Sequence, residues 1–249
     1  CVKLKVPTTY WCCVNCPGNP AAWKRHAVYH KKVKRRWTVT EDGGVHQQLQ
    51  REAAEEQARI AALTGDKYQE LLADGSRYLS KQDYRRAARA YREAIALEPD
   101  APYAYHNLGA ALTNSAHQVE AAQRFLEAKE RHPVGSEHWA GATANAFIML
   151  TQRACAEVAK PEWWNDEGLK ALSARVMRAA PNNMPANKMR AAVLGRRSGG
   201  SWEAGPRSVA EFKEAATHYD RAAALHIAPA GKAHLADAAA QCRRQAGAV

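Results

Sequence analysis

The sequence repeats itself at a fixed spacing of 34 residues in the middle of the chain, and this period restricts the fold more than any other feature. The stretches 75–99 and 109–133 align without a gap. The matched positions are Gly75 and Gly109, Tyr78 and Leu112, Ala87 and Ala121, Tyr91 and Phe125, Ala94 and Ala128, and Pro99 and Pro133. Each unit holds two amphipathic helices, with small residues where they cross closely and a proline that ends the second helix. The period therefore predicts an array of helical hairpins.

These positions resemble the pattern of the tetratricopeptide repeat family, whose first large position is occupied here by Leu71 and Tyr105. The resemblance extends over about residues 65–246 and implies a right-handed superhelix, in which the first helix of each hairpin lines a concave groove for peptides or partner proteins. The predicted fold class is all-α. We expect a short right-handed solenoid of about four hairpins with a C-terminal capping helix, preceded by a basic arm that contains Cys and His.

The later repeats are less regular because two insertions interrupt them. Residues 137–150 continue the period, since Trp139 follows Tyr105 by 34 positions, and 165–181 supply the partner helix. A fourth unit pairs 186–197 with 208–225, and 230–245 form the capping helix. The insertions are 151–164 and 198–206, and they carry Trp163, Trp164 and Trp202. We expect these tryptophans to anchor an interface, although they could equally fold back on their own repeats.

The charge of the chain is concentrated in its first segment. Residues 1–40 carry nine Lys or Arg and no Asp or Glu, whereas the whole chain has a net charge of +11. The sequence therefore divides into a basic, Cys/His/Trp-rich arm at 1–40, a linking helix at 45–64 and the repeats at 65–246. Such a segregated basic block is typical of a segment that meets nucleic acid, acidic protein or anionic lipid, or of a solubilising tail. The basic residues taken as contacts are Lys24, Arg25, Lys31, Lys32, Lys34, Arg35 and Arg36.

Cysteine and histidine in the arm have the spacing of zinc ligands. Cys13-x2-Cys16 followed by His26-x3-His30 offers two thiolates and two imidazoles, which suit one structural zinc ion. The stretch also resembles the second half of a MYND-type zinc module, with Cys12-x3-Cys16 and Trp23-x2-His26-x3-His30, although His30 replaces that module's last cysteine. That resemblance implies binding of proline-containing peptides. The alternative is a metal-free arm whose free thiols are buried against another subunit.

The groove that the resemblance implies would be lined by polar and aromatic residues of the first helices. The expected groove residues are Tyr103, His106, Asn107, Thr113, Asn114, Glu137 and Phe147. Some members of the family hold the carboxyl terminus of chaperones at five positions, which fall here on Leu72, Ser76, Asn107, Glu137 and Gly141. Only the asparagine matches, and Glu137 would repel a carboxylate. We therefore expect no binding of a chaperone tail.

Other functional classes find little support in the sequence. There is no phosphate-cradling glycine loop, nucleophile elbow or HExxH motif, so we expect no enzyme activity and no cofactor apart from the zinc. The longest uncharged apolar run, 138–152, is too short to span a bilayer. Cys155 and Cys242 lie in helical sequence and are predicted core residues, which favours a reducing, intracellular compartment.

The function expected from these features is that of a non-catalytic scaffold or adaptor in a larger multi-subunit assembly. The groove would bind a segment of one protein partner, and the basic arm would anchor the protein to a second. One alternative is an RNA- or ribosome-associated factor that uses the arm for phosphate contact. Another is a zinc-dependent adaptor in transcription or chromatin, built on the MYND-type resemblance.

Overall fold

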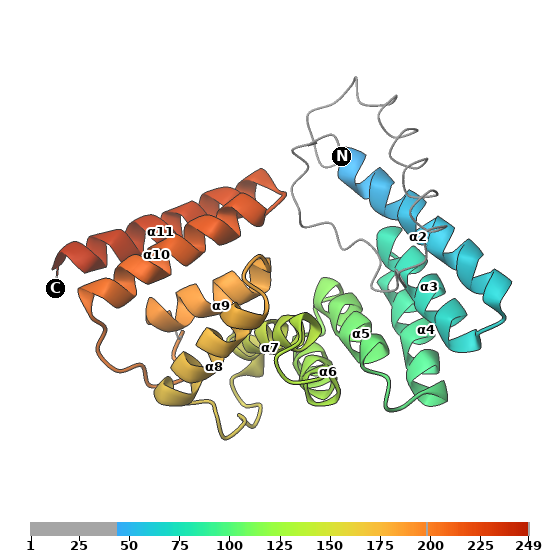
Figure 1. Ribbon diagram of the computed structural model, residues 1–249, viewed down its shortest axis with the longest axis horizontal. Coiled ribbons are helices and arrows are strands. Elements are labelled where there is room, and N and C mark those ends of the chain that lie inside the picture. The colour runs from blue at the N-terminus through green and yellow to red at the C-terminus, as the bar shows by residue number, and fades with distance from the viewer. Residues whose placement is uncertain (1–43, 198, 249) are drawn as a thin grey trace. The chain divides into compact units, whose positions relative to one another are not determined.

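The computed structural model describes residues 44–197 and 199–248 of the chain, and Figure 1 shows the helices in these ranges. The chain divides into two units after Gln48, and the unit that begins at Leu49 is described here by itself. Within the described ranges the structure contains helices and no strand, so the predicted all-α class is confirmed. The predicted zinc ligands and the basic contacts of the arm lie outside the described residues.

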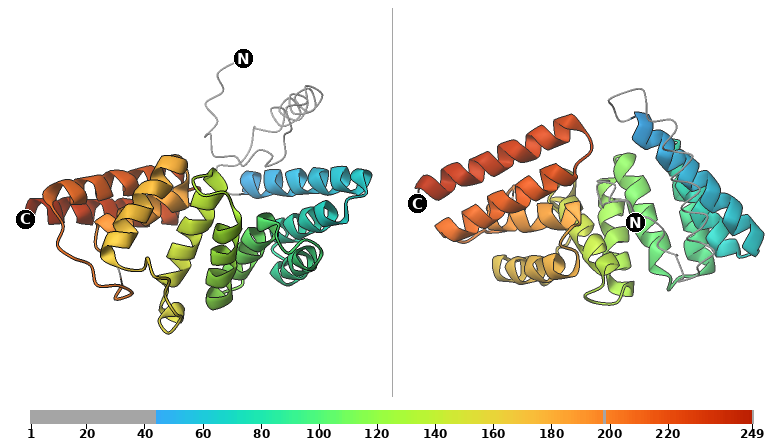
Figure 2. Two further views of the ribbon diagram at one scale, coloured as in Figure 1. Left: turned by 60° about the horizontal axis from the view of Figure 1, so that its bottom comes forward. Right: turned by 45° about the horizontal axis from the view of Figure 1, so that its top comes forward.

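The helices form consecutive hairpins in which each helix from α3 onward packs against its neighbours in sequence (Figures 1 and 2). They are α2 (Gly44–Thr64), α3 (Lys67–Ser80), α4 (Tyr84–Leu97), α5 (Pro102–Asn114), α6 (Gln118–Arg131), α7 (Glu137–Leu150), α8 (Asp166–Ala179), α9 (Met184–Leu194), α10 (Val209–Leu225) and α11 (Pro229–Ala248). A short 3-10 helix, η1, covers Arg153–Cys155. The arrangement is a tetratricopeptide-like solenoid, with first helices α3, α5, α7 and α9 and a closing helix α11.

Local sequence signals set where these helices begin. A side-chain oxygen just before the helix accepts a hydrogen bond from a backbone N–H of the first turn, which satisfies a group that has no partner inside the helix. The residues that do this are Asp66, Asp83, Ser136, Asn165, Asn183 and Ser208. Helix α5 lacks such a cap and instead starts with Pro102, whose fixed φ suits the first helical position.

The two helices of each regular hairpin cross at a glycine, as the repeat predicted. A Cβ atom on Gly75 would collide with the ring of Tyr91 on α4, and one on Gly109 would lie 2.9 Å from the ring of Phe125 on α6. Tyr91 is fully buried and Phe125 nearly so. The missing glycine side chain thus leaves the space into which the aromatic ring of the next helix fits.

The turns inside the hairpins also follow the period. Gln82 and Ala116, one between α3 and α4 and the other between α5 and α6, both adopt positive φ, at 61° and 63°. They stand 34 residues apart, at the same place in consecutive repeats. Arg196, which follows α9, has a φ of 53°. A left-handed residue here lets the chain reverse direction after the first helix.

The ends of the solenoid are covered by α2 and α11. Arg51 of α2 donates a hydrogen bond to the carbonyl of Ser80, and Glu55 pairs with Lys81 at 3.2 Å, so this helix packs on the first repeat. Helix α11 lies along α10 and buries Leu235. None of the helices in the described part is both long enough and apolar enough to cross a lipid bilayer.

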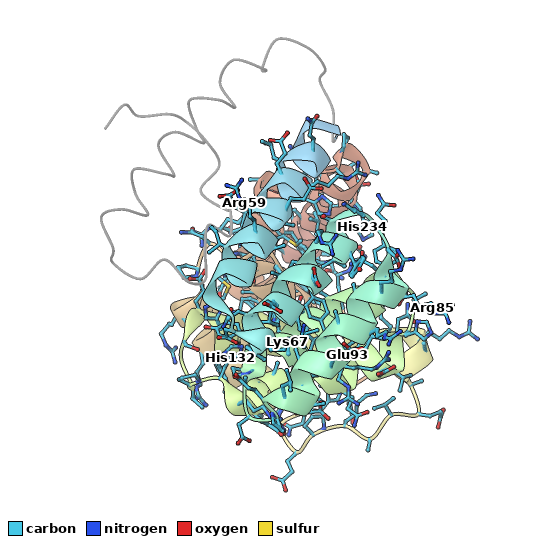
Figure 3. All side chains as sticks on the ribbon, turned by 90° about the vertical axis from the view of Figure 1, so that its right-hand side faces the viewer. Arg59, Lys67, Arg85, Glu93, His132 and His234 are labelled. Atoms are coloured by element: carbon cyan, nitrogen blue, oxygen red, sulfur yellow. The ribbon has the colours of Figure 1, made fainter. Side chains whose placement is uncertain are left out.

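The first repeat carries much of its charge at the surface. Arg85 projects away from α4 into solvent in the view of Figure 3. Arg89 and Glu93 form an ion pair at 2.9 Å on the exposed face of the same helix. An exposed pair one helical turn apart contributes little to stability, so α4 is held mainly by its buried alanines and Tyr91.

Candidate partner-binding groove

Helix α5 supplies most of the predicted groove residues, and they differ in how free their polar groups are. Thr113 donates to the carbonyl of Gly109 at 2.8 Å, and Asn114 donates to the carbonyl of Ala110 at 2.9 Å. The hydroxyl of Thr113 therefore satisfies its donor on its own helix, and Asn114 uses one of its two amide N–H donors there. The amide of Asn107 is half-exposed and has no hydrogen-bond partner within the described residues. Asn107 is thus the member of this set best placed to bond to a peptide backbone.

Three histidines and a tyrosine gather where α5, the end of α6 and the start of α7 meet. The rings of His132 and His138 stack with centroids 5.3 Å apart, and Tyr103 meets the edge of each at 5.2 Å. His106 packs against the ring of Phe125 at 5.3 Å. Two of the predicted groove residues, Tyr103 and His106, therefore belong to an aromatic joint between the second and third hairpins.

Two histidines of this joint, His106 and His132, are kept neutral. Burial, together with the neighbouring His132 and His138, lowers the pKa of His106 to about 4. Burial and His138 lower the pKa of His132 to about 4 as well. A protonated imidazole here would be poorly hydrated and would lie beside another, so the joint favours the uncharged form of both rings.

Glu137 and Phe147, the predicted groove residues of α7, have different environments. Glu137 lies in the exposed first turn of the helix, where a carboxylate suits the positive end of the helix dipole. Phe147 is only 2% exposed and packs against Trp164 at 5.5 Å and Trp202 at 5.7 Å. The expectation that Phe147 offers apolar surface to a partner is therefore wrong, because its ring is enclosed by the two insertions.

The same packing corrects the expectation for two of the three tryptophans. Trp164 and Trp202 are buried, and the indole N–H of Trp164 donates to the carbonyl of Ser201 at 2.7 Å. They fold back on their own repeats and tie the insertion 151–164 to the insertion 198–206, so they are not available as interface anchors. Trp163 is half-exposed and lies beside Lys129, whose amine is 5.7 Å from its ring.

A pocket farther along the first helices involves residues that the sequence reasoning did not select. It has a volume of about 140 Å³ and lies among the end of α7, helix α9 and the closing pair α10 and α11. Lys188, Arg197 and His234 are among its lining residues. The sequence signal for Lys188 and Arg197 is their place in 186–197, the predicted first helix of the fourth unit, whereas His234 lies in the capping helix and has no such signal.

No group of three or more His, Cys, Asp or Glu side chains is arranged to hold a metal ion in the part of the chain that the structure describes. Cys155 and Cys242 are free and buried, so their predicted place in the core is confirmed. The predicted metal ligands Cys12, Cys13, Cys16, His26 and His30 fall outside the described residues, and the zinc site stays a prediction.

The comparison with known families agrees with this geometry. Residues 75–114, which run from the second half of α3 to the end of α5, match the family described as TPR repeat. This segment is therefore a tetratricopeptide repeat, as its resemblance predicted. No curated protein matches the chain.

Proposed function

We propose that this protein is a non-catalytic scaffold or adaptor that binds a segment of a protein partner along its first helices. The observation that carries the proposal is the tetratricopeptide repeat at 75–114, because repeats of this kind generally serve as modules for protein–protein interaction. The half-exposed amide of Asn107 and the exposed carboxylate of Glu137 are polar groups that an extended segment can meet.

The basic arm adds a second anchor in this proposal. Nine Lys or Arg and no acidic residue in 1–40 would attract an acidic partner inside a larger assembly, in an intracellular, reducing compartment. If the cysteines and histidines of the arm hold one zinc ion, chelation should unfold that segment and leave the repeats intact.

The charge of the arm also supports a second candidate, an RNA- or ribosome-associated factor. Binding of nucleic acid through Lys and Arg releases counterions and therefore weakens steeply as salt rises. The repeats would then hold protein while the arm contacts phosphate. Only the sequence of the arm favours this candidate over the first.

The experiment that separates the two isolates the tagged protein from cells that produce it, in mild salt, with and without nuclease. Mass spectrometry then identifies the proteins that co-purify. A fixed set of proteins that survives nuclease and a rise in salt supports the scaffold. A set that disappears with the nucleic acid overturns it in favour of the RNA-associated factor.

A further inference from the structure

The pocket among α7, α9, α10 and α11 combines apolar walls with an excess of positive charge. Ile148 and Ala192, which are half-buried, contribute apolar surface, whereas Lys188, Arg197 and His234 contribute nitrogen donors. No Asp or Glu lines the pocket. With a volume of about 140 Å³ it is well below the roughly 300 Å³ at which sites for drug-sized ligands and cofactors begin. Its size suits one side chain rather than a whole cofactor.

The ammonium group of Lys188 lines this pocket without a negatively charged partner in the described part of the chain. No carboxylate pairs with it among the residues that the structure describes, and burial lowers the pKa of its amine. Arg190, two positions further along α9, shows the contrast, because its guanidinium pairs with Glu214 at 2.8 Å. Holding a half-buried cation without a partner costs free energy. An anion from outside the chain would offset this cost by pairing with Lys188.

Arg197 adds a second cation that is already held in place. Its guanidinium donates to the side-chain oxygen of Gln241 at 3.0 Å and lies 5.9 Å from the centre of the Tyr219 ring. Neither partner carries a negative charge that would neutralise it. Two cations, Lys188 in the middle of α9 and Arg197 three residues after its end, thus line one small pocket, whose apolar side can cover a short aliphatic stem.

We propose that this pocket receives the carboxylate of a Glu or Asp side chain from an extended segment of the partner protein. Lys188 and Arg197 pair with the carboxylate, and the apolar side packs against the methylene groups. A single pocket of this size does not match a nucleic-acid backbone, which needs a row of cations along an extended groove. The inference rests on the proposed function and names the chemistry of the partner. It concerns a different place from the five positions tested for a chaperone tail.

The first test uses nuclear magnetic resonance on the isotope-labelled full chain. The probes are a short acetylated and amidated peptide with a single Glu among Ala and Ser, and the same peptide with Gln. We expect the Glu peptide to shift the backbone resonances of Thr151, Gln152 and Lys188, and the Gln peptide to bind about tenfold more weakly or worse. The proposal is overturned if the Glu peptide causes no shift at the pocket that the Gln peptide lacks. It is also overturned if a single-stranded oligonucleotide shifts these resonances and the Glu peptide does not.

The second test replaces the cation. Lys188→Met should weaken the Glu peptide by about tenfold or more and leave the unfolding temperature unchanged or higher, because the variant removes an unpaired half-buried charge. Lys213→Met, on the exposed side of α10, removes the same charge outside the pocket and should bind as the wild type does. A marked fall in the unfolding temperature of Lys188→Met would show that Lys188 holds the fold, which contradicts the proposal.

Capture of the native partner separates this inference from the proposed function. If the wild type and Lys213→Met capture the same nuclease-resistant protein and Lys188→Met loses it, both stand. If all three capture it equally, the pocket proposal fails and the scaffold function remains. If none captures a nuclease-resistant protein while the Glu peptide still binds the pocket, the scaffold function fails by itself.

Discussion

At the scale of single residues, the repeat depends on a few positions where a small side chain meets a large one. Gly75 and Tyr91, and Gly109 and Phe125, are the same contact in consecutive hairpins. The sequence predicted both, because glycine and an aromatic residue recur together at the period. It did not predict the ring stacking of His132 and His138, since neither residue follows the repeat. Contacts that the period imposes are predictable, and contacts peculiar to one joint are not.

Replacing Gly75 by alanine tests the close crossing of α3 and α4. The added methyl would collide with the Tyr91 ring, which is fully buried and whose hydroxyl lies 3.2 Å from that of Ser76, so the ring has little room to move. We expect Gly75→Ala to lower the free energy of unfolding by about 1–3 kcal/mol, measured by chemical denaturation. Gly247→Ala is the matched control, because nothing lies within 4 Å of its added atom. Equal stability of the two variants would contradict the account.

The histidine joint predicts a loss of stability in mild acid. His106 and His132 have pKa values of about 4 in the folded chain against a usual value of 6.5, so the unfolded chain binds more protons between these limits. Stability is therefore full above pH 6.5 and falls as the pH drops towards 4, by on the order of 3 kcal/mol for each histidine.

Thermal unfolding of the wild type and His106→Gln from pH 7 to pH 4 measures this effect. The variant should lose less stability than the wild type across the window, whereas His117→Gln, at an exposed position, should follow the wild type. Burial also lowers the pKa of His218, which is unchanged in both variants and so cancels in the comparison. Parallel curves for His106→Gln and the wild type would show that His106 is not kept neutral by the fold.

At the scale of helices and loops, the two insertions are structural links between the third and fourth hairpins. The side chain of Arg207 is fully buried at the end of the second insertion and pairs with Asp166 in the first turn of α8. It also donates to the carbonyl of Val193 at 3.0 Å, near the end of α9. With Trp164 and Trp202, this arginine fixes the loops against the helices that they connect.

The sequence predicted the helices on either side of the insertions but not the paths of the loops. Alternation of apolar and polar residues, together with caps such as Asn165 and Ser208, marks a helix from local information. The bond from Trp164 to Ser201 joins residues 37 positions apart, and no local pattern encodes it. Large aromatics on loops suit an interface or a fold-back equally well, and only the tertiary structure decides between them.

Replacing Asp166 by asparagine tests the link between the insertions. Asn keeps the size of the side chain but leaves Arg207 as a buried cation without a charged partner. We expect Asp166→Asn to lower the free energy of unfolding by about 3 kcal/mol or more, measured by chemical denaturation. Glu93→Gln is the control, since it breaks the exposed pair with Arg89 and should cost less than about 1 kcal/mol. If both variants lower the free energy of unfolding by a similar amount, the buried pair contributes no more to stability than the exposed pair.

At the scale of the whole molecule, the described unit is a row of helical hairpins whose first helices hold the residues proposed to meet a partner. The period predicted the regular hairpins, and the need to cover the exposed end of an array predicted the capping helix, whereas 45–64 was expected only as a linking helix. The pocket lined by Lys188, Arg197 and His234 was not predicted, because these residues come from α9, the loop after it and α11, which meet only in the folded array. The chemical class of the partner therefore follows from the surface residues and not from the repeat pattern.

Whether the first helices bind the partner is tested by comparing partner capture between two variants with the same change in charge. Asn107→Lys places a long cation at the half-exposed position on α5, whereas Gln123→Lys places it on the exposed side of α6. The tagged variants are isolated in parallel after nuclease treatment, and the co-purifying proteins are quantified against the wild type. We expect Asn107→Lys to lose the nuclease-resistant partner by about tenfold or more while Gln123→Lys keeps it, because a charge without an opposite charge in an interface is costly. Equal capture by the two variants, both folded, would contradict the claim that the first helices bind the partner.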